Sequence, residues 1–80
     1  MWNEKKSPSR LEKRFEFDNY QITSNFMSQI DDLCKEKEIY PNISFGGKFV
    51  SITIFFQSDK ISIKEKELST EIDNRYEKLN

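Results

Sequence analysis

Apolar and polar positions alternate from Arg10 to Phe17, RLEKRFEF. The period of two predicts a β-strand with one buried side. Lys13 interrupts the apolar side, so we expect the strand to enter the core only from Phe15 onward. A short outer strand is expected around Trp2. The two sides of the main strand are Leu11, Lys13, Phe15 and Phe17 against Glu12, Arg14 and Glu16.

The pattern changes to a helical period after Asp18. Asp18 is the expected N-cap, with Gln21 three residues later in the manner of a capping box. The helix should end before Pro41, because a residue that precedes proline disfavours the α region. Its apolar stripe is predicted to contain Ile22, Phe26, Met27, Ile30, Leu33 and Cys34.

Two further strands are predicted between Asn42 and Gln57. Gly46 and Gly47 separate them, and we expect these glycines to supply the positive φ angles of a tight hairpin turn. The second strand has an apolar face and a mixed face. The apolar face should lie under a helix, and the mixed face should be partly solvated or docked. The two faces are Val50, Ile52, Ile54 and Phe56, and Phe49, Ser51, Thr53 and Phe55.

A second helix is predicted from Ser62 to the end of the sequence. Ser62 and Glu65 have the spacing of a capping box, and Leu68, Ile72, Tyr76 and Leu79 recur at helical intervals. The element order is therefore β-β-α-β-β-α. The expected fold class is α+β, with a four-stranded antiparallel sheet and two helices packed on one face. Residues 1–80 are expected to form a single domain.

Composition narrows the classes of function. A net charge of −1 provides no basic surplus for phosphate contacts, so nucleic acid is not an expected partner. No apolar run is long enough for a membrane span or signal segment, and we expect a cytoplasmic protein. Basic residues outnumber acidic ones in residues 1–14. This excess is interpreted as solvated surface, with a docking patch for an acidic partner as the alternative.

Candidate catalytic chemistry is scarce. The chain has no histidine, which removes the usual general base and the common zinc ligand. Cys34 lies on the apolar helical stripe and is expected to be a buried structural thiol. Gly46-Gly47 is not followed by a helix start, so it is not a phosphate-binding loop. No catalytic residue, metal site or cofactor is predicted from these residues.

Several segments together resemble a known family. These are WNE from Trp2, RFEF, the pair Phe26-Met27, Pro41, VSITI, and KISIKEKELSTEID. In this order they are similar to the pterin-4a-carbinolamine dehydratases, small α+β proteins that also act as dimerisation cofactors. The family's first helix, which precedes the Trp segment, is missing here. The resemblance implies the fold and a homodimer.

The resemblance also locates the family's catalytic positions. Its His-His-Pro motif falls on Ile39, Tyr40 and Pro41, and a further histidine falls on Gln57. Its acidic residue at the start of the last helix falls on Glu65. Dehydration of a 4a-hydroxypterin needs positioned acid and base groups. We therefore expect the fold without the activity, a pseudoenzyme.

The segments YPNISFG and SRLEKRFEF are similar to one branch of the family, the dehydratase-like Rubisco assembly factors of α-carboxysome bacteria. This implies a non-catalytic chaperone in carbon fixation with the Rubisco large subunit as partner and an association with the carboxysome. The residues expected to bind the partner are Tyr40, Pro41, Asn42, Ser44, Phe45, Phe49, Phe55 and Gln57.

Other interpretations remain open. Phe45 and Phe55 would alternatively pack within the sheet or at a homodimer interface, and Tyr40 would pack where the helix stops. A residual pterin dehydratase is the second function class. A dimerisation cofactor of a transcription regulator is the third, and it predicts a partner on a helical face that includes Ile72 and Tyr76.

Overall fold

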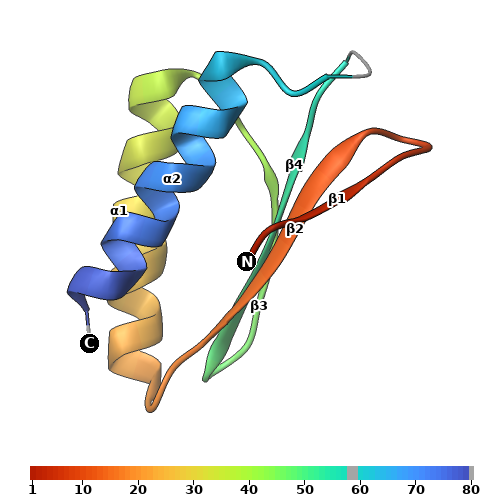
Figure 1. Ribbon diagram of the computed structural model, residues 1–80. Helices are drawn as coiled ribbons and strands as arrows, with labels where there is room; N and C mark the ends of the chain where they lie inside the picture. The colour runs from red at the N-terminus through yellow and green to blue at the C-terminus, as the bar shows by residue number, and fades with distance from the viewer. Residues whose placement is uncertain (58–59, 80) are drawn as a thin grey trace.

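A computed structural model of the protein describes residues 1–57 and 60–79. Four antiparallel strands form one sheet in the order β1-β2-β4-β3. Both helices cover the same face of this sheet, which confirms the predicted fold class (Figure 1). The elements are β1 Asn3–Lys5, β2 Arg10–Glu16, α1 Tyr20–Lys37, β3 Asn42–Phe45, β4 Phe49–Phe55 and α2 Ile63–Lys78.

The strand register sorts side chains onto the two faces of the sheet. Leu11 pairs with Ile54, and Ile52 has Lys13 on one side and Ile43 on the other, so these residues face the helices. The intervening positions lie on the opposite side. We call it the open face, and in β2, β3 and β4 it consists of Arg10, Glu12, Arg14, Glu16, Asn42, Ser44, Phe49, Ser51, Thr53 and Phe55.

The core lies between the helices and the sheet. Every residue of the predicted apolar face of β4 is buried, and the helical stripes contribute Phe26, Ile30, Leu33, Cys34, Leu68 and Ile72. Leu11 is also buried, at 6% exposed, so the expectation that β2 enters the core only from Phe15 onward is wrong. Lys13 does not exclude the strand from the core, because its ammonium pairs with Asp73 at 2.7 Å.

Aromatic rings fill the end of the core where β2 leads into α1. Phe26 contacts Phe15 and Phe17 with ring centroids 5.1 and 5.0 Å away. Tyr76 of α2 lies 4.9 Å from Phe15, and its hydroxyl donates to the carbonyl of Glu16 at 2.9 Å. Aromatic pairs of this kind contribute about 0.5–1.5 kcal/mol beyond their buried area. These aromatic pairs therefore add to the stability of a core that contains few residues.

The first helix begins one residue later than predicted. Asn19, not Asp18, is its N-cap, and the Asn19 side chain accepts the amide of Ile22 at 2.9 Å. Asp18 cannot take this role because the extended chain continues through Phe17, whose amide donates to the Lys48 carbonyl at 2.9 Å. The cap must be the last non-helical residue.

The hairpin glycines do not have the predicted positive φ angles. Gly46 is required for space instead, because a Cβ on it would stand 2.4 Å from Cε1 of Phe49. Gly47 has no heavy atom within 4 Å of its Cβ position. The turn therefore requires glycine at position 46 because a side chain there would collide with the Phe49 ring. A left-handed backbone is not the reason.

Candidate partner-binding surface

The structure divides the predicted binding residues between two sides of the sheet. Asn42, Ser44, Phe49 and Phe55 lie on the open face, and Gln57 is exposed just beyond β4. Phe45 pairs with Val50 and therefore lies on the helix side. Phe45 therefore lies on the opposite face of the sheet from Phe49 and Phe55, and the three rings do not form one cluster.

The open face has aromatic residues at both ends of β4 and hydroxyl groups between them. The Arg14 guanidinium lies 4.1 Å from the centroid of the Phe49 ring, a cation–π contact that covers this ring. Phe55 is 45% exposed. Ser51 and Thr53 line a hollow of about 190 Å³ in the middle of this face. Phe55 is therefore the more available aromatic anchor.

Charged side chains on β1 and β2 are paired with one another. Arg10 Nε lies 2.6 Å from the Glu12 carboxylate, and Lys5 Nζ lies 3.2 Å from it. The hydrogen bond from Arg10 is the main cause of the lowered pKa of Glu12, followed by that from Lys5. In this half of the open face the charged side chains form ion pairs with one another, whereas the β3–β4 half has no charged side chain.

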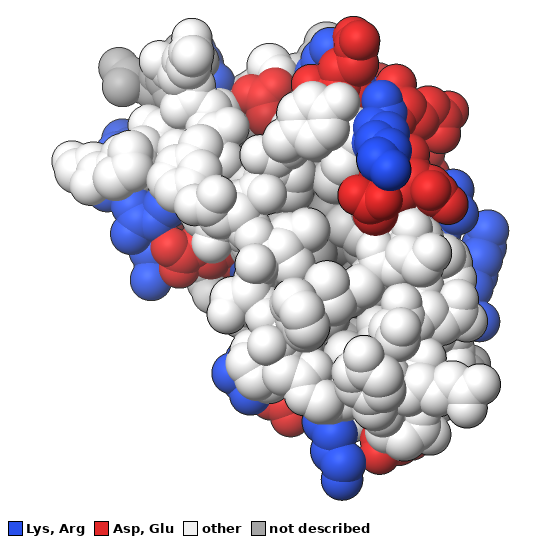
Figure 2. Space-filling view, turned by 180° about the vertical axis from the view of Figure 1, so that it is seen from behind, with Lys and Arg blue, Asp and Glu red and all other residues white. Residues whose placement is uncertain are grey.

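A second hollow lies on the helix side, between α1 and β3. It has a volume of about 320 Å³ and an uncharged lining made of Tyr20, Thr23, Ser24, Met27, Ser28 and Phe45. Thr23 is buried, and its hydroxyl lies 3.0 Å from the Gly47 carbonyl. Figure 2 looks onto this side of the molecule and shows a broad uncharged area with charged side chains along its margins.

The sequence did not indicate a hollow beside α1, and the α1 residues that line it were not predicted as functional. Of these residues only Met27 belongs to the predicted apolar stripe, and the others, Tyr20, Thr23, Ser24 and Ser28, lie beside that stripe. A signal was present in the sequence, because residues 20–30 contain no charged side chain in a chain that is 34% charged. A surface helix normally carries charge on its outer face, so this segment is unusual.

The positions that correspond to the family's catalytic residues do not form an acid/base site. Ile39 packs against the hydrophobic core, and Tyr40 is 72% exposed. Glu65 lies in the first turn of α2, where its carboxylate accepts the Ser62 hydroxyl and its amide donates to that same oxygen. The predicted N-cap Ser62 is confirmed, and the Glu65 carboxylate is bonded to the Ser62 hydroxyl instead of the backbone N–H of a capping box.

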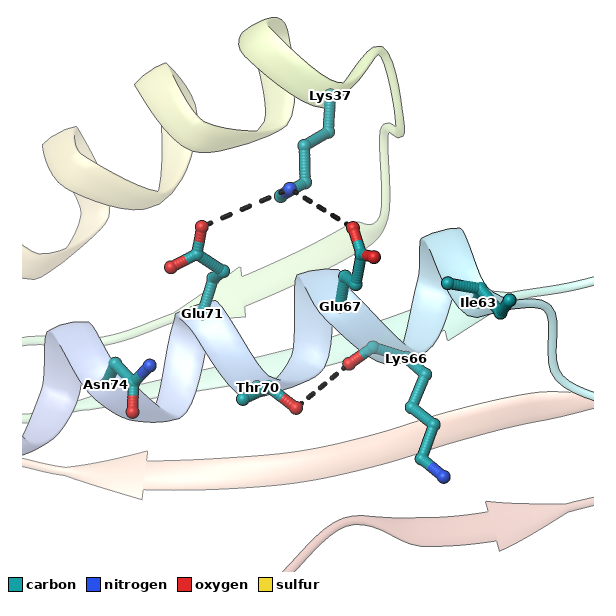
Figure 3. Close-up of a pocket in the computed structure, with 7 residues that line it drawn as sticks. All are labelled: Lys37, Ile63, Lys66, Glu67, Thr70, Glu71 and Asn74. Atoms are coloured by element: carbon teal, nitrogen blue, oxygen red, sulfur yellow. Dashed lines mark hydrogen bonds and ion pairs between the residues drawn. The ribbon is translucent and has the colours of Figure 1, made fainter.

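The outer surface of the helices has a hollow of about 410 Å³ (Figure 3). Lys37 reaches from α1 to Glu67 and Glu71 of α2, with distances of 3.9 and 4.0 Å, and exposed Ile63 stands at one end. Long, exposed pairs of this kind contribute little. The predicted helical-face residues are elsewhere: Ile72 is fully buried and Tyr76 packs against the core. Neither residue lines this hollow.

Residues 1–57 and 60–79 also lack a metal site and a membrane-spanning helix. This part of the chain contains no cluster of three or more histidine, cysteine or acidic residues that could hold a metal ion. None of its helices is both long and apolar enough to cross a membrane. Cys34 is buried as predicted, and burial, followed by the nearby charge of Asp31, raises the pKa of its thiol.

The fold and the sequence define the class of protein. Residues 1–75 match the family of pterin 4 alpha carbinolamine dehydratases, and the chain belongs to this family. Among solved structures it is similar to a pterin dehydratase-like protein identified as a RuBisCO assembly factor in the alpha-carboxysome, with 30% identity and a TM-score of 0.85. That alignment covers 94% of this chain and 88% of the other.

A second solved structure shares the fold. It is a transcriptional coactivator/pterin dehydratase from Brucella melitensis, with a TM-score of 0.83 and 13% identity. The alignment covers 94% of this chain and 81% of that one. At this identity the likeness concerns the fold alone. A comparison with curated proteins gave no match.

Proposed function

We propose that this protein is a non-catalytic assembly factor, a chaperone that assists the folding or assembly of the Rubisco large subunit in an α-carboxysome system. The observation that carries the proposal is the similarity to the RuBisCO assembly factor over nearly the whole length of both chains. The proposal includes a cytoplasmic protein that associates with the carboxysome during carbon fixation.

The absence of catalysis is part of the proposal and rests on the residues at the catalytic positions. Ile39 and Gln57 cannot transfer protons near neutral pH, and the Glu65 carboxylate is engaged in capping α2. In an assay of 4a-hydroxypterin dehydration we expect the rate with protein to equal the uncatalysed rate. Turnover above that rate would identify the protein as a dehydratase.

The docking surface is proposed to lie on the uncharged β3–β4 half of the sheet and the segment that leads into it. Asn42, Ser44 and Gln57 provide exposed hydrogen-bonding groups, and Phe55 provides an exposed ring. Tyr40 and Pro41 extend this surface before β3, and Phe49 lies at its turn. Phe45 lies on the other side of the same strand and would take part from the edge of the sheet. Partner surfaces favour this mixture of aromatic and uncharged polar groups.

Co-expression of Rubisco subunits tests the function. Large and small subunits of an α-carboxysomal Rubisco are produced with and without this protein, and the yield of assembled holoenzyme is measured. We expect a clear gain in yield that the double variant Tyr40→Ala/Gln57→Ala loses. Lys64→Ala/Asn74→Ala alters exposed residues of α2 and should keep the gain. The same low yield with and without the protein would refute the proposed function.

The homodimer is a separate part of the proposal. A second copy would cover exposed surface on a chain of only 80 residues. Sedimentation equilibrium measures it directly, and a mass of one chain across the concentration range would refute it.

A further inference from the structure

The hollow on the outer surface of the helices belongs neither to the core nor to the docking surface proposed on the sheet. It lies along α2, with Lys37 of α1 on one side, and has a volume of about 410 Å³ (Figure 3). Ile63 stands at one end and is 78% exposed, and the uncharged Asn74 stands at the other. A single exposed isoleucine is ordinary, but one beside a hollow of this size can hold an apolar side chain of another molecule.

The surface inside this hollow is more apolar than its residue types suggest. Long charged side chains keep their charged groups in water and lay their methylene stems along the surface below. Most of the lining residues are of this kind: Lys37, Lys66, Glu67 and Glu71. The Thr70 hydroxyl is already bonded to the Lys66 carbonyl at 3.1 Å. An apolar group placed beside Ile63 would therefore contact carbon atoms and leave the Thr70 hydroxyl with its partner.

The rim of the hollow beside α1 has more negative than positive charge. Lys37 Nζ lies between the Glu67 and Glu71 carboxylates at 3.9 and 4.0 Å, so one ammonium faces two anions. A direct charge-assisted hydrogen bond is about 2.7–2.9 Å long, and neither contact is that short. The Glu67 and Glu71 side chains remain 61% and 44% exposed, and the Lys66 side chain extends away from them (Figure 3). Both carboxylates can therefore accept a further cation from outside.

The end of α1 next to this rim is also acidic. Lys35 is held by Asp31 at 3.0 Å, whereas Asp32 and Glu36 are exposed and lie one turn apart on the same side of the helix. The helix terminus adds the partial negative charge of its last carbonyl groups. The charged residues of this end are Asp31, Asp32, Glu36 and Glu38 against Lys35 and Lys37. Figure 2 shows acidic side chains gathered where α1 ends, so this end of the molecule attracts cations.

We propose that the hollow, from Ile63 to Glu71, binds a short positively charged segment of the partner, with one apolar side chain beside Ile63 and a lysine or arginine on Glu67 and Glu71. The proposal rests on the proposed function, under which the partner is the Rubisco large subunit, and adds a second contact surface on the helices. Ile63 and Glu67 are one helical turn apart, about 6 Å. The apolar and the basic residue of the segment are therefore two positions apart if it is extended and one turn apart if it is helical.

The structure favours a partner segment over a second copy of this chain. The positive charge of the chain is concentrated in residues 1–14, but most of these basic side chains already have an anion within the chain. The pairs are Lys5 and Arg10 with Glu12, Lys13 with Asp73, and Arg14 with Glu16. A second copy would have to break such pairs before it bound, whereas a segment of an unassembled subunit is exposed.

Amide signals of the isotope-labelled wild-type protein test the inference directly. The probes are short overlapping peptides that span the sequence of the Rubisco large subunit. A peptide with a lysine or arginine close to an apolar residue should shift the signals of Ile63, Glu67 and Thr70. Its Kd should rise about tenfold or more when the salt concentration is raised from about 0.05 M to about 0.5 M. If no basic peptide shifts these signals, or if the Kd is independent of salt, the inference is overturned.

A matched pair of variants isolates the charge of the rim. Glu67→Gln/Glu71→Gln removes two charges from the hollow, and Glu4→Gln/Asp18→Asn removes two from exposed positions elsewhere. The ion pairs of the rim are long and exposed, so the first variant should keep the thermal midpoint of the wild type. We expect it to raise the Kd of a binding peptide about fivefold or more and to lower the gain in holoenzyme yield. The second variant should retain both.

Replacement of Ile63 isolates the apolar contact. Ile63→Ala removes most of the side chain and should raise the Kd about tenfold, whereas Ile63→Leu keeps an apolar side chain of equal size and should bind as the wild type does. Ile63 is 78% exposed, so both variants should fold. Equal Kd values for the wild type and the alanine variant would contradict the proposed contact.

The outcomes distinguish the inference from the proposed function. If wild type and Glu67→Gln/Glu71→Gln raise the holoenzyme yield equally, the basic-segment site is wrong while the assembly function stands. If wild type gives no gain in yield, the assembly function fails, and the peptide titration then decides the basic-segment site alone. Shifts of the Ile63 and Glu67 signals that grow with protein concentration, without peptide, would assign the hollow to a second copy and overturn the inference.

Discussion

Lys13 of β2 and Asp73 of α2 form an ion pair of 2.7 Å, and the same carboxylate oxygen of Asp73 accepts the indole N–H of Trp2 at 3.1 Å. The Lys13 ammonium also lies 4.9 Å from the centroid of the Phe15 ring. One carboxylate on a helix therefore holds residues from the N-terminal segment and from a central strand of the sheet.

Replacement of Asp73 should destabilise the fold. Asp73→Ala leaves the Lys13 side chain, which is only 19% exposed, without its anion and leaves the Trp2 indole without its acceptor. We expect the free energy of unfolding to fall by about 1–3 kcal/mol, measured by denaturant titration, with a shifted emission of Trp2. Asp31→Ala removes an equal charge from an exposed pair with Lys35 and should cost only a few tenths of a kcal/mol. Equal losses for the two variants would contradict this account.

The two hairpin glycines should respond differently to alanine. In Gly46→Ala the new methyl group overlaps the Phe49 ring, so the ring must move from beneath Arg14, at a cost of about 1–3 kcal/mol. Gly47→Ala meets no atom within 4 Å and should leave the free energy of unfolding unchanged or slightly higher. Thermal unfolding of both variants measures the difference, which should vanish if the close contact is not a constraint.

Cys34 should be inert in the folded protein. It is 4% exposed, and its raised pKa keeps the thiol protonated at neutral pH. Iodoacetamide should therefore modify Cys34 slowly in buffer and rapidly in denaturant. Modification of the native protein at the rate of the unfolded chain would show that the thiol is accessible and that its environment differs from the one described.

Glu12 should contribute to acid sensitivity. Its pKa is lowered by hydrogen bonds from Arg10 and Lys5, so the unfolded chain binds this proton more readily than the folded protein does. The stability from this group is present above the ordinary glutamate pKa of 4.5 and is lost as pH falls through the lower, folded value. Glu12→Gln should flatten the loss of stability in acid, as followed by urea midpoints at several pH values. Glu4→Gln, on the neighbouring strand, is the control for removal of one charge.

Local patterns predicted most of the fold because their physical basis is local. The period of two placed Val50 and Ile54 correctly on the buried face, and the helical period placed Phe26 and Leu68 in the core. The ion pair of Lys13 could not be predicted, because its partner is 60 residues away. Lys13 was instead interpreted as an interruption of the apolar side, beyond which the strand would enter the core only from Phe15.

The binding residues were predicted less well, for two physical reasons. Phe45 was grouped with Phe49 by residue type, but the two rings lie on opposite faces of the sheet. Phe45 pairs with Val50, which faces the helices, whereas Phe49 pairs with Gly46 and lies on the open face. The hollow beside α1 depends on how Tyr20 and Met27 meet Phe45 in space, which no spacing in the sequence specifies. Packing between elements decides such a surface.

The hydrogen bond from Trp2 to Asp73 also bears on how the protein is made. The two residues are separated by 71 positions, so during translation the N-terminal segment emerges long before the residue that fixes it. Contacts of such large sequence separation form late because a long loop must close first. On the ribosome, therefore, the Trp2 side chain cannot form this hydrogen bond until Asp73 has been translated and α2 has packed against the sheet.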